Sequence, residues 1–315
     1  MSFSLTVKNE IARIMPKKKC CQLAELAVLV GMNGKQESRN GQPLLVVSNE
    51  NAAAARKIFK LCRSLFPHLL LQVAVTKKKR LKKNNVYHVF IPCRAGSESI
   101  LDLLGLELKG GKFLRWTDEL RGRKCCRRAY LRGAFLAGGS VSNPRGNYHL
   151  EIITRDLAQA GFHCSLMEAF GLQPRINQRK LKQVIYLKES DQIVHFLNLV
   201  GAHAALLSFE NTRVVKDVRN RVNRLVNCET ANLSKSVETG VRQVETIRYL
   251  QSRLGLEKLP ASLREIACLR LEHPEASLKE LGQMLDPPVS KSGANHRLRR
   301  LEEMAANLEQ EGRMT

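Results

Sequence analysis

The chain has 315 residues, a hydrophobic content of 43% and a formal net charge of +23, with a pI of about 10.0. This length suffices for two or three domains, and no run approaches the roughly 18 unbroken apolar residues of a membrane span. The amino terminus lacks the apolar segment of a signal peptide, so we expect a cytoplasmic protein without a membrane partner. So strong a positive charge predicts a polyanionic partner, and nucleic acid is the first candidate.

The positive charge is concentrated in the first part of the chain. Residues 240–315 carry a net charge of +1, whereas residues 1–239 carry +22. Because phosphate contacts dominate the affinity of proteins for nucleic acids, any such contact surface must include the first part of the chain.

The cysteines do not form a recognisable metal motif. There are nine of them, and no Cys-x-x-Cys spacing occurs. In a cytoplasmic protein reduced thiols are more common than a disulfide framework. The adjacent pairs Cys20–Cys21 and Cys125–Cys126 are interpreted as small, half-buried residues at helix starts, poorly placed to share one metal ion. No metal and no cofactor are therefore expected.

Two similar segments indicate an internal repeat. Residues 20–34 read CCQLAELAVLVGMNG and residues 125–140 read CCRRAYLRGAFLAGGS, at a constant offset of 105 positions. Each segment is typical of an apolar helix with small residues along it, and the second ends in Gly-Gly, where a helix is expected to stop. We predict that the two helices pack against each other, since small residues let their backbones approach closely.

The elements of the first half follow in chain order. A helix is predicted at 2–16, with Ser4 as its N-cap and Pro16 as its end. The linker between the two later strands reads KKKRLKKNN, which predicts a hairpin with a strongly basic tip. The remaining elements are a helix at 21–32, a strand at 43–48, a helix at 51–65, strands at 69–76 and 86–91, and a short helix at 97–104.

The second half repeats this order after the Gly138-Gly139 helix end. Its elements are a strand at 148–153, a helix at 156–170, a hairpin of strands at 175–179 and 183–187, and a short helix at 190–199. Each half thus reads helix–strand–helix–strand–strand–helix, with room for one further strand. The repeat predicts an α+β domain of two similar lobes related by a pseudo-twofold axis.

The carboxy-terminal part is predicted to be helical throughout. A long basic helix at 210–228 is followed by a predicted break at 230–232, a second helix at 232–254 and a short link. Three short helices are then expected at 262–271, 277–285 and 290–308. Ser277 and Glu280 match the capping box that starts the second of these three.

The last three helices resemble a helix-turn-helix, which places its second helix in the major groove with its first residues at base edges. Asn can bind adenine bidentately and Arg can bind guanine in the same way. Arg299 and Arg300 are predicted to contact phosphate. The residues predicted to reach bases are Ser290, Lys291, Ser292, Asn295, His296 and Arg297. A plain three-helix bundle with a solvated polar face is the alternative.

Other basic side chains are candidates for phosphate contacts. They lie at the two predicted hairpin tips and on the helix that starts at residue 210. They are Lys77, Lys78, Lys79, Arg80, Lys82, Lys83, Lys180, Lys182, Arg213, Lys216, Arg221 and Arg224. A solvated charged surface would show the same pattern, so both interpretations stay open.

The paired helices resemble the LAGLIDADG motif of homing endonucleases, in which two such helices form the interface between lobes. Residues 26–34 and 131–139 match that motif position by position. In that family the acidic residue before the final glycine binds the catalytic metal, and the matching positions here are Asn33 and Gly138. Mg²⁺ usually needs one or two carboxylate ligands. The resemblance therefore predicts a lobe pair with no catalytic residues, because two-metal cleavage lacks its ligands.

Essentially the whole chain resembles the WhiA family of bacterial DNA-binding proteins, in which such an acid-free lobe pair is joined to a helix-turn-helix. The segments that carry this resemblance are residues 2–4 and 7–10 (SFS and VKNE), 130–141 (YLRGAFLAGGSV), 143–144 (NP), 224–233 (RLVNCETANL), 287–293 (PPVSKSG) and 295–298 (NHRL).

The resemblance implies a non-enzymatic protein of the bacterial nucleoid that binds double-stranded DNA and regulates transcription. In such proteins the helix-turn-helix recognises promoters and the lobes serve as a scaffold or a second DNA contact. Family roles include the control of sporulation genes, cell division and chromosome segregation. Another transcription factor and RNA polymerase are further candidate partners.

The expected domains are a first lobe at 1–105, a second lobe at 106–205, basic connecting helices at 206–258 and a helix-turn-helix domain at 259–315. Because both lobes lie in one chain, lobe pairing requires no dimer and a monomer is expected. Two alternative functions are a residual metal-dependent endonuclease and a maturase-like RNA binder. Aromatic residues make up only 5% of the chain, which argues against stacking on single strands.

Overall fold

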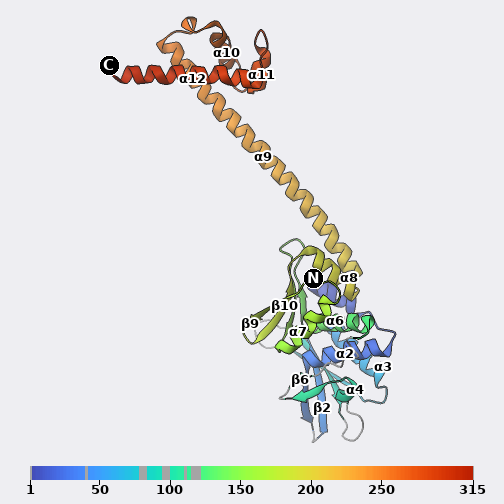
Figure 1. Cartoon of the computed structure of the whole chain (residues 1–315). Helices are drawn as coiled ribbons and strands as arrows, with labels where there is room; N and C mark the ends of the chain where they lie inside the picture. The colour runs from blue at the N-terminus through green and yellow to red at the C-terminus, as the bar shows by residue number, and fades with distance from the viewer. Residues whose placement is uncertain are drawn as a thin grey trace. The chain divides into compact units, whose positions relative to one another are not determined.

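The computed structural model describes residues 2–39, 42–77, 84–93, 100–109, 112–114 and 122–314 (Figure 1). The chain divides into two compact units, Met1–Lys216 and Asp217–Thr315. In the described part of the chain the first unit contains every strand and the second is helical. Each helix among these residues is too short or too polar to cross a membrane.

The first lobe starts with α1 (Phe3–Ala12), which differs from its predicted bounds. Ser2, not Ser4, is the N-cap: its hydroxyl accepts a hydrogen bond from the Leu5 amide at 3.3 Å. Ser4 lies inside the helix, where its hydroxyl accepts a hydrogen bond from the Val141 amide of the second lobe. The elements that follow are α2 (Lys19–Asn33), β1 (Gly34–Arg39), β2 (Gln42–Asn49), α3 (Ala52–Leu65), β3 (Gln72–Lys77), β4 (Asn85–Pro92) and α4 (Ile100–Leu103).

The second lobe repeats the first and follows a small hairpin that the sequence pattern did not predict, made of β5 (Glu107–Lys109) and β6 (Lys112–Leu114). Its elements are α6 (Lys124–Gly138), β7 (Gly139–Val141), β8 (Leu150–Thr154), α7 (Leu157–Glu168), β9 (Arg175–Arg179), β10 (Lys182–Leu187) and α8 (Ser190–Val200).

The further strand for which each predicted lobe had room is β1 in the first lobe and β7 in the second. Both strands start directly at the glycine that caps the preceding repeat helix, because Gly34 and Gly139 have extended backbone angles. The two sheets have the same antiparallel order, β1-β2-β4-β3 and β7-β8-β10-β9. This identical topology confirms the predicted α+β fold of two similar lobes.

The repeat helices α2 and α6 pack side by side at the centre of this unit (Figure 1). Their backbones come so close that a Cβ atom on Gly133 would lie 2.8 Å from the Glu25 carbonyl oxygen. A single apolar core runs through both lobes and includes fully buried Leu26, Leu29 and Phe135. The predicted pairing of the two helices is therefore confirmed.

The second unit begins within α9 (His203–Arg253), which is one continuous helix of 51 residues. The break predicted at 230–232 was wrong, because this stretch contains no glycine or proline and Asn232 is tolerated inside a helix at a modest energetic penalty. Its side chain donates to the Cys228 sulfur one turn earlier, at 3.7 Å, instead of capping a new helix.

Three helices follow the short 3₁₀ turn Leu256–Lys258 and complete the second unit. They are α10 (Ala261–Glu272), α11 (Leu278–Met284) and α12 (Lys291–Met314). The predicted capping box of Ser277 and Glu280 is present in both directions. These helices and the end of α9 share a separate apolar core, which includes Leu250, Ile266 and Leu298.

Candidate nucleic-acid interface

The turn between α11 and α12 is held by hydrogen bonds from the backbone. The Val289 amide donates to the Gly282 carbonyl at 2.8 Å, and the Asp286 amide donates to the Glu265 carboxylate on α10 at 2.8 Å. Ser290 then caps α12, since its hydroxyl accepts from the Gly293 amide at 3.2 Å. These bonds fix the angle at which α12 leaves the turn, which a recognition helix requires.

The first turns of α12 present most of the predicted DNA-contacting residues to solvent. Asn295 is half-buried beside the core residue Ala294, so its amide lies at the edge of the exposed face. A helix amino terminus with free amides and nearby cations is a favourable place for a phosphate group. The exposed members of the predicted set are Ser290, Lys291, Ser292, His296, Arg299 and Arg300.

Arg297 has a role inside the unit that the sequence pattern did not predict. Its guanidinium lies 3.6 Å from the Glu265 carboxylate and donates to the Ser262 carbonyl at 3.4 Å. Both partners belong to α10, so Arg297 braces α12 against that helix. A contact between Arg297 and guanine would have to replace these interactions.

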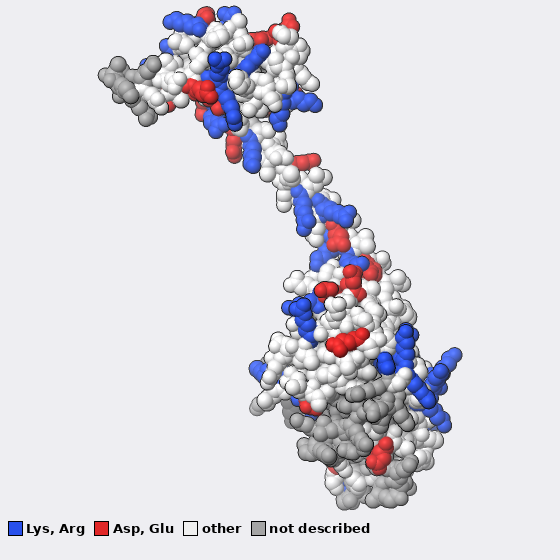
Figure 2. Space-filling view, viewed as in Figure 1, with Lys and Arg blue, Asp and Glu red and all other residues white. Residues whose placement is uncertain are grey.

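The predicted phosphate contacts at the hairpins and on α9 fall into three groups, which are exposed residues, residues outside the described parts of the chain and residues that already pair with neighbours. Lys77, Lys180 and Lys182 are exposed at strand ends, while Arg221 and Arg224 are exposed on α9. Figure 2 shows Lys and Arg side chains mixed with Asp and Glu along the visible face of α9, rather than a continuous basic stripe. Five members of the set lie outside the described residues, namely Lys78, Lys79, Arg80, Lys82 and Lys83.

Two other predicted phosphate contacts are already occupied by neighbours in the first unit. Arg213 pairs with Asp191 and with Glu210, the latter at 3.0 Å. Lys216 donates to the Gly146 carbonyl at 2.7 Å and its ammonium lies 4.5 Å from the centre of the Tyr148 ring. These two side chains hold α9 to the lobes, so they are poorer candidates for DNA contact than the exposed ones.

A polar cavity of about 1250 Å³ lies beside the carboxyl end of α2. Its lining suits an anion, because basic residues predominate and Glu50 is the single acidic residue among the described lining residues. Burial lowers the pKa of Lys8, although the Glu50 carboxylate opposes this shift. The basic residues that line the cavity are Lys8, Arg13, Arg56, Lys57, Lys60, Arg155 and Lys182.

The two positions that match the metal ligands of homing endonucleases lie at this same end of the helix pair. The Asn33 side chain donates to the Ala137 carbonyl at 3.3 Å, so it links the two helix ends. A Cβ atom on Gly138 would lie 2.5 Å from the Ile153 carbonyl oxygen, which leaves no room for a side chain. Neither position offers a carboxylate, the usual ligand of Mg²⁺ in proteins.

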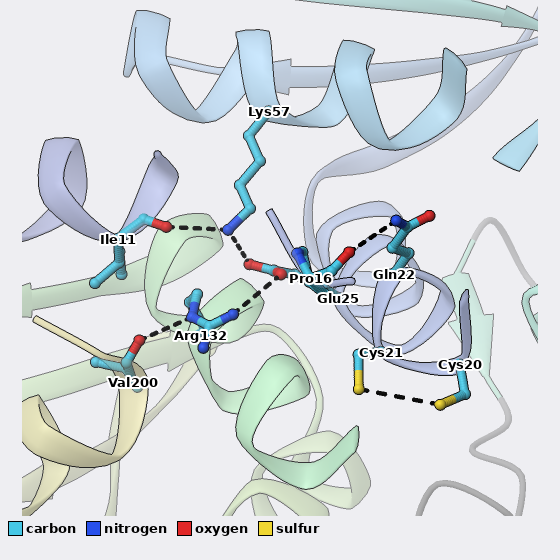
Figure 3. Close-up of polar contacts among 9 residues, drawn as sticks. All are labelled: Ile11, Pro16, Cys20, Cys21, Gln22, Glu25, Lys57, Arg132 and Val200. Atoms are coloured by element: carbon cyan, nitrogen blue, oxygen red, sulfur yellow. Dashed lines mark hydrogen bonds and ion pairs between the residues drawn. The ribbon is translucent and has the colours of Figure 1, made fainter. Parts of the chain in front are cut away.

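A buried ionic network lies in the middle of the interface between the lobes (Figure 3). Lys57 of α3 pairs with Glu25 of α2, both side chains being fully buried, and also donates to the Ile11 carbonyl at 3.0 Å. Arg132 of α6 lies 3.6 Å from the same carboxylate and donates to the Val200 carbonyl at 2.8 Å. The network thus joins helices from both lobes, and nothing in the sequence pattern indicated it.

Burial acts against the charges of this network. It lowers the pKa of Lys57 to about 8, and the nearby Glu25 carboxylate only partly offsets the effect. Burial likewise raises the pKa of Glu25, against the opposing influence of Lys57 and Arg132. The charged forms are therefore retained by mutual pairing, and loss of Lys57 or Glu25 would leave the other buried charge without its nearest counter-ion.

The two adjacent cysteine pairs meet in space, contrary to the interpretation from sequence. The four sulfur atoms of Cys20, Cys21, Cys125 and Cys126 all lie within 4.8 Å of one another. The pairs come together because each stands in the first turn of a repeat helix and the two helices pack side by side. Burial raises the pKa of Cys21 to about 12.

Comparison with known proteins gives matches over almost all of the chain. The family model of the WhiA N-terminal LAGLIDADG-like domain matches residues 19–107, and that of the WhiA LAGLIDADG-like domain matches residues 127–219. The model of the WhiA C-terminal HTH domain matches residues 222–305.

Full-length relatives are similar throughout. A probable cell division protein WhiA of Heliobacterium modesticaldum is 54% identical, with 99% of this chain and 98% of that protein covered. The protein of the same name from Desulforamulus reducens is 53% identical, covering 98% and 96%.

Solved structures share the fold. The crystal structure of full-length DUF199/WhiA from Thermatoga maritima is similar with a TM-score of 0.57 and 24% identity, covering 98% of this chain and 99% of that one. The N-terminal LAGLIDADG domain of DUF199/WhiA gives a TM-score of 0.51 at 20% identity, covering 64% of this chain and 90% of that one.

Proposed function

The chain belongs to the WhiA family, and from that premise we propose that it binds double-stranded DNA through the helix-turn-helix of its second unit. The observation that carries this proposal is the set of exposed basic residues Lys291, Arg299 and Arg300 on α12, a helix fixed by the bonds of its preceding turn. Relatives named as probable cell division proteins support a role in cell division.

We propose that the protein regulates genes on the DNA that it binds and does not cut this DNA. The carboxyl end of the α2–α6 pair, where a homing endonuclease would hold its metal, has the amide of Asn33 and a glycine at 138. The basic cavity beside it would serve as a second contact with the DNA backbone. This protein would act in the cytoplasm at the nucleoid, as a monomer, and a second transcription factor or RNA polymerase would be its partner at promoters.

The phosphate part of the proposal is tested by the salt dependence of binding to a mixed-sequence duplex. A plot of log affinity against log salt concentration has a negative slope, and each lost phosphate contact makes that slope less steep by about 0.9. The triple replacement Lys291→Ala, Arg299→Ala and Arg300→Ala is therefore expected to make the slope less steep by about 2 to 3. The matched control is Arg248→Ala, an exposed arginine of α9, which should leave the slope unchanged. An unchanged slope in the triple variant would reject α12 as the contact surface.

Base reading requires a separate measurement. Duplexes recovered by mapping bound DNA across the source genome are compared with shuffled sequences of the same composition. Asn295→Ala should reduce the preference for the recovered duplexes by about 1–3 kcal/mol while affinity for shuffled DNA changes little. An equal loss on both kinds of duplex would argue against base reading by Asn295.

The two alternative functions have direct tests. Supercoiled plasmid incubated with the protein and Mg²⁺ or Mn²⁺ should remain intact, and nicking that disappears with Asn33→Ala would establish a nuclease. Competition between duplex DNA and RNA for the protein should favour DNA, and a preference for RNA would support the maturase-like alternative.

A further inference from the structure

Four of the nine cysteines converge at one end of the interface between the lobes. The sulfur atoms of Cys20 and Cys21 lie 4.0 Å apart, and all four sulfurs lie within 4.8 Å of one another. Two of them come from α2 and two from α6, more than a hundred residues later in the chain. Figure 3 shows the Cys20 and Cys21 side chains at the start of α2 with their sulfurs close together. Such a group is a set of ligands on two elements, not a lone reactive thiol.

The separations fit one tetrahedral metal ion. With Zn–S bonds of about 2.3 Å, the sulfurs of a Cys₄ zinc site lie about 3.8 Å apart. The sulfurs here would each have to move by well under about 1 Å to adopt that geometry. A disulfide, by contrast, requires an S–S distance of about 2.05 Å, so two sulfurs would have to approach by roughly 2 Å. A cluster of several irons and sulfides would have to push the four thiols farther apart.

The four cysteines lie where the two repeat helices begin. Cys20 and Cys21 stand in the first turn of α2, and Cys125 and Cys126 in the first turn of α6; neither helix has a side-chain cap. The positive end of the helix dipole at such a terminus attracts negative charge, including that of a metal-bound thiolate. Arg123, the residue before α6, interacts with Cys20 and supplies a positive charge beside the cluster.

The burial of the four residues suits a metal that enters from solvent and is then enclosed. Cys21 and Cys126 are buried, Cys20 is half-buried and Cys125 is exposed. The other five cysteines, Cys62, Cys93, Cys164, Cys228 and Cys268, do not belong to this group. Sulfur ligands in a tetrahedral S₄ arrangement select zinc or iron among the metals available to a cell.

We propose that Cys20, Cys21, Cys125 and Cys126 bind one zinc ion that joins the amino-terminal ends of α2 and α6. Four protein ligands leave no open coordination position, so the site is structural and not catalytic. It lies about 18 Å along α2 from Asn33, by the rise of an α-helix, at the end opposite the degenerate endonuclease positions. The ion therefore holds the two lobes together where the ionic network of Glu25 does not reach.

The metal content of the full chain is the first test. Protein purified under reducing conditions without chelators, from cells grown with zinc, should contain about one zinc ion per chain by elemental analysis. Cys21→Ser and Cys126→Ser should each reduce the zinc content at least tenfold. The matched controls Cys228→Ser and Cys268→Ser, which alter exposed cysteines outside the cluster, should retain the full zinc content.

A titration of the metal-free wild-type chain with Co²⁺ keeps the test independent of how the variants fold. Binding should saturate at about one equivalent, with the visible bands of tetrahedral cobalt and the near-ultraviolet bands of thiolate ligands, and zinc should displace it. Absence of both zinc and cobalt binding by the reduced chain would overturn the proposal. So would iron with matching acid-labile sulfide, or thiols that become titratable only after reduction, which would establish a cluster or a disulfide instead.

Discussion

The two lobes fill one equivalent place in their cores with opposite chemistry. In the first lobe Glu25 of α2 pairs with Lys57 of α3, and both side chains are fully buried. The residues 105 positions later are Tyr130 of α6 and Phe162 of α7, whose rings meet edge to face with centroids 5.3 Å apart. A duplicated fold thus fixes where two side chains meet but leaves open whether charge or aromatic surface fills the space.

The difference matters because the ionic pair acts beyond its own lobe. The Glu25 carboxylate also reaches Arg132, which lies on the helix of the second lobe. A buried charge needs every partner it has, whereas an aromatic pair tolerates partial loss of contact. We therefore expect the first lobe to be more sensitive to single substitutions at this place, and the predictions below test that asymmetry.

The largest effect is expected from Lys57→Met. The substitution keeps most of the length of the side chain but leaves the buried Glu25 carboxylate with Arg132 at 3.6 Å as its remaining cation in the described network. Breaking a buried pair in this way should lower the free energy of unfolding by about 3–5 kcal/mol in urea denaturation. Lys60→Met, at an exposed position of the same helix, is the matched control and should have almost no effect.

The double variant Glu25→Leu with Lys57→Met separates charge from packing. Since replacement of both buried charges by apolar groups is often neutral, it should recover most of the stability that Lys57→Met loses. A double variant as unstable as the single one would mean that shape, and not the unpaired charge, is responsible.

A pH-dependent effect is expected from His163, which occupies the place of Ile58 of the first lobe. Burial lowers the pKa of His163 to about 4, although its hydrogen bond to the Gln159 carbonyl opposes this shift. Because the unfolded chain then binds more protons than the folded one between about pH 6.5 and pH 4, stability falls as the pH falls through that range. The loss should approach about 3 kcal/mol near pH 4.

The variant His163→Ile gives the second lobe the residue of the first and should remove this part of the pH dependence. Denaturation curves at several pH values would show it as a flatter profile below pH 6.5. His195→Ile, at an exposed position of α8, is the control and should keep the slope of the parent chain. Identical profiles for His163→Ile and the parent would contradict the assignment.

A smaller loss is expected from Gly133→Ala at the helix crossing. The added Cβ would lie 2.4 Å from Val28 Cγ1 and 2.8 Å from the Glu25 carbonyl oxygen. Overpacking of this kind should lower the free energy of unfolding by about 1–3 kcal/mol. Gly161→Ala in α7, where nothing lies within 4 Å, should be neutral or slightly stabilising. If both variants change the free energy of unfolding by the same amount, then Gly133 is not needed for the close approach of the helices.

The smallest effect is expected from Asn33→Ala. The variant loses one half-buried hydrogen bond to the Ala137 carbonyl, which should reduce the free energy of unfolding by about 1 kcal/mol. The matched variant Asn33→Asp, in which a carboxylate cannot donate to that carbonyl, should lose at least as much. A loss of unfolding free energy well above that of Gly133→Ala would mean that this end of the α2–α6 pair contributes more to the stability of the lobe interface than the structure indicates.

Most of the fold could be predicted from the sequence because the repeat keeps a constant spacing in the elements that pack in the core. The offset of 105 positions holds through the central helices and again at the starts of α3 and α7, Ala52 and Leu157. The strands β1 and β7 were missed because they are short or polar: β1 reads GKQESR, with only Gly34 buried. Their presence follows from the pairing with β2 and β8 and not from local pattern.

The site was less predictable than the fold because its key contacts are distant in sequence. Lys57 stands in the stretch Arg56-Lys57-Ile58, where nothing distinguishes it from an exposed lysine until Glu25 is seen beside it. The four cysteines look like two unrelated pairs until α2 and α6 are placed together. The helix-turn-helix is local, and its capping box and the bounds of α10 and α11 were accordingly predicted well, although α12 continues to Met314, six residues past its predicted end at 308. The bond from Arg297 to Ser262, by contrast, depends on how α10 and α12 pack.

The glycine at position 138 limits what a single mutation can add to the chain. Every codon for glycine becomes one for aspartate or glutamate by a single nucleotide change, so an acid at this position is always one mutation away. Yet any side chain there would press on the Ile153 carbonyl at 2.5 Å and on Met32. That codon change alone would therefore not place a usable carboxylate beside Asn33, because β8 would first have to move away from the space that the side chain needs.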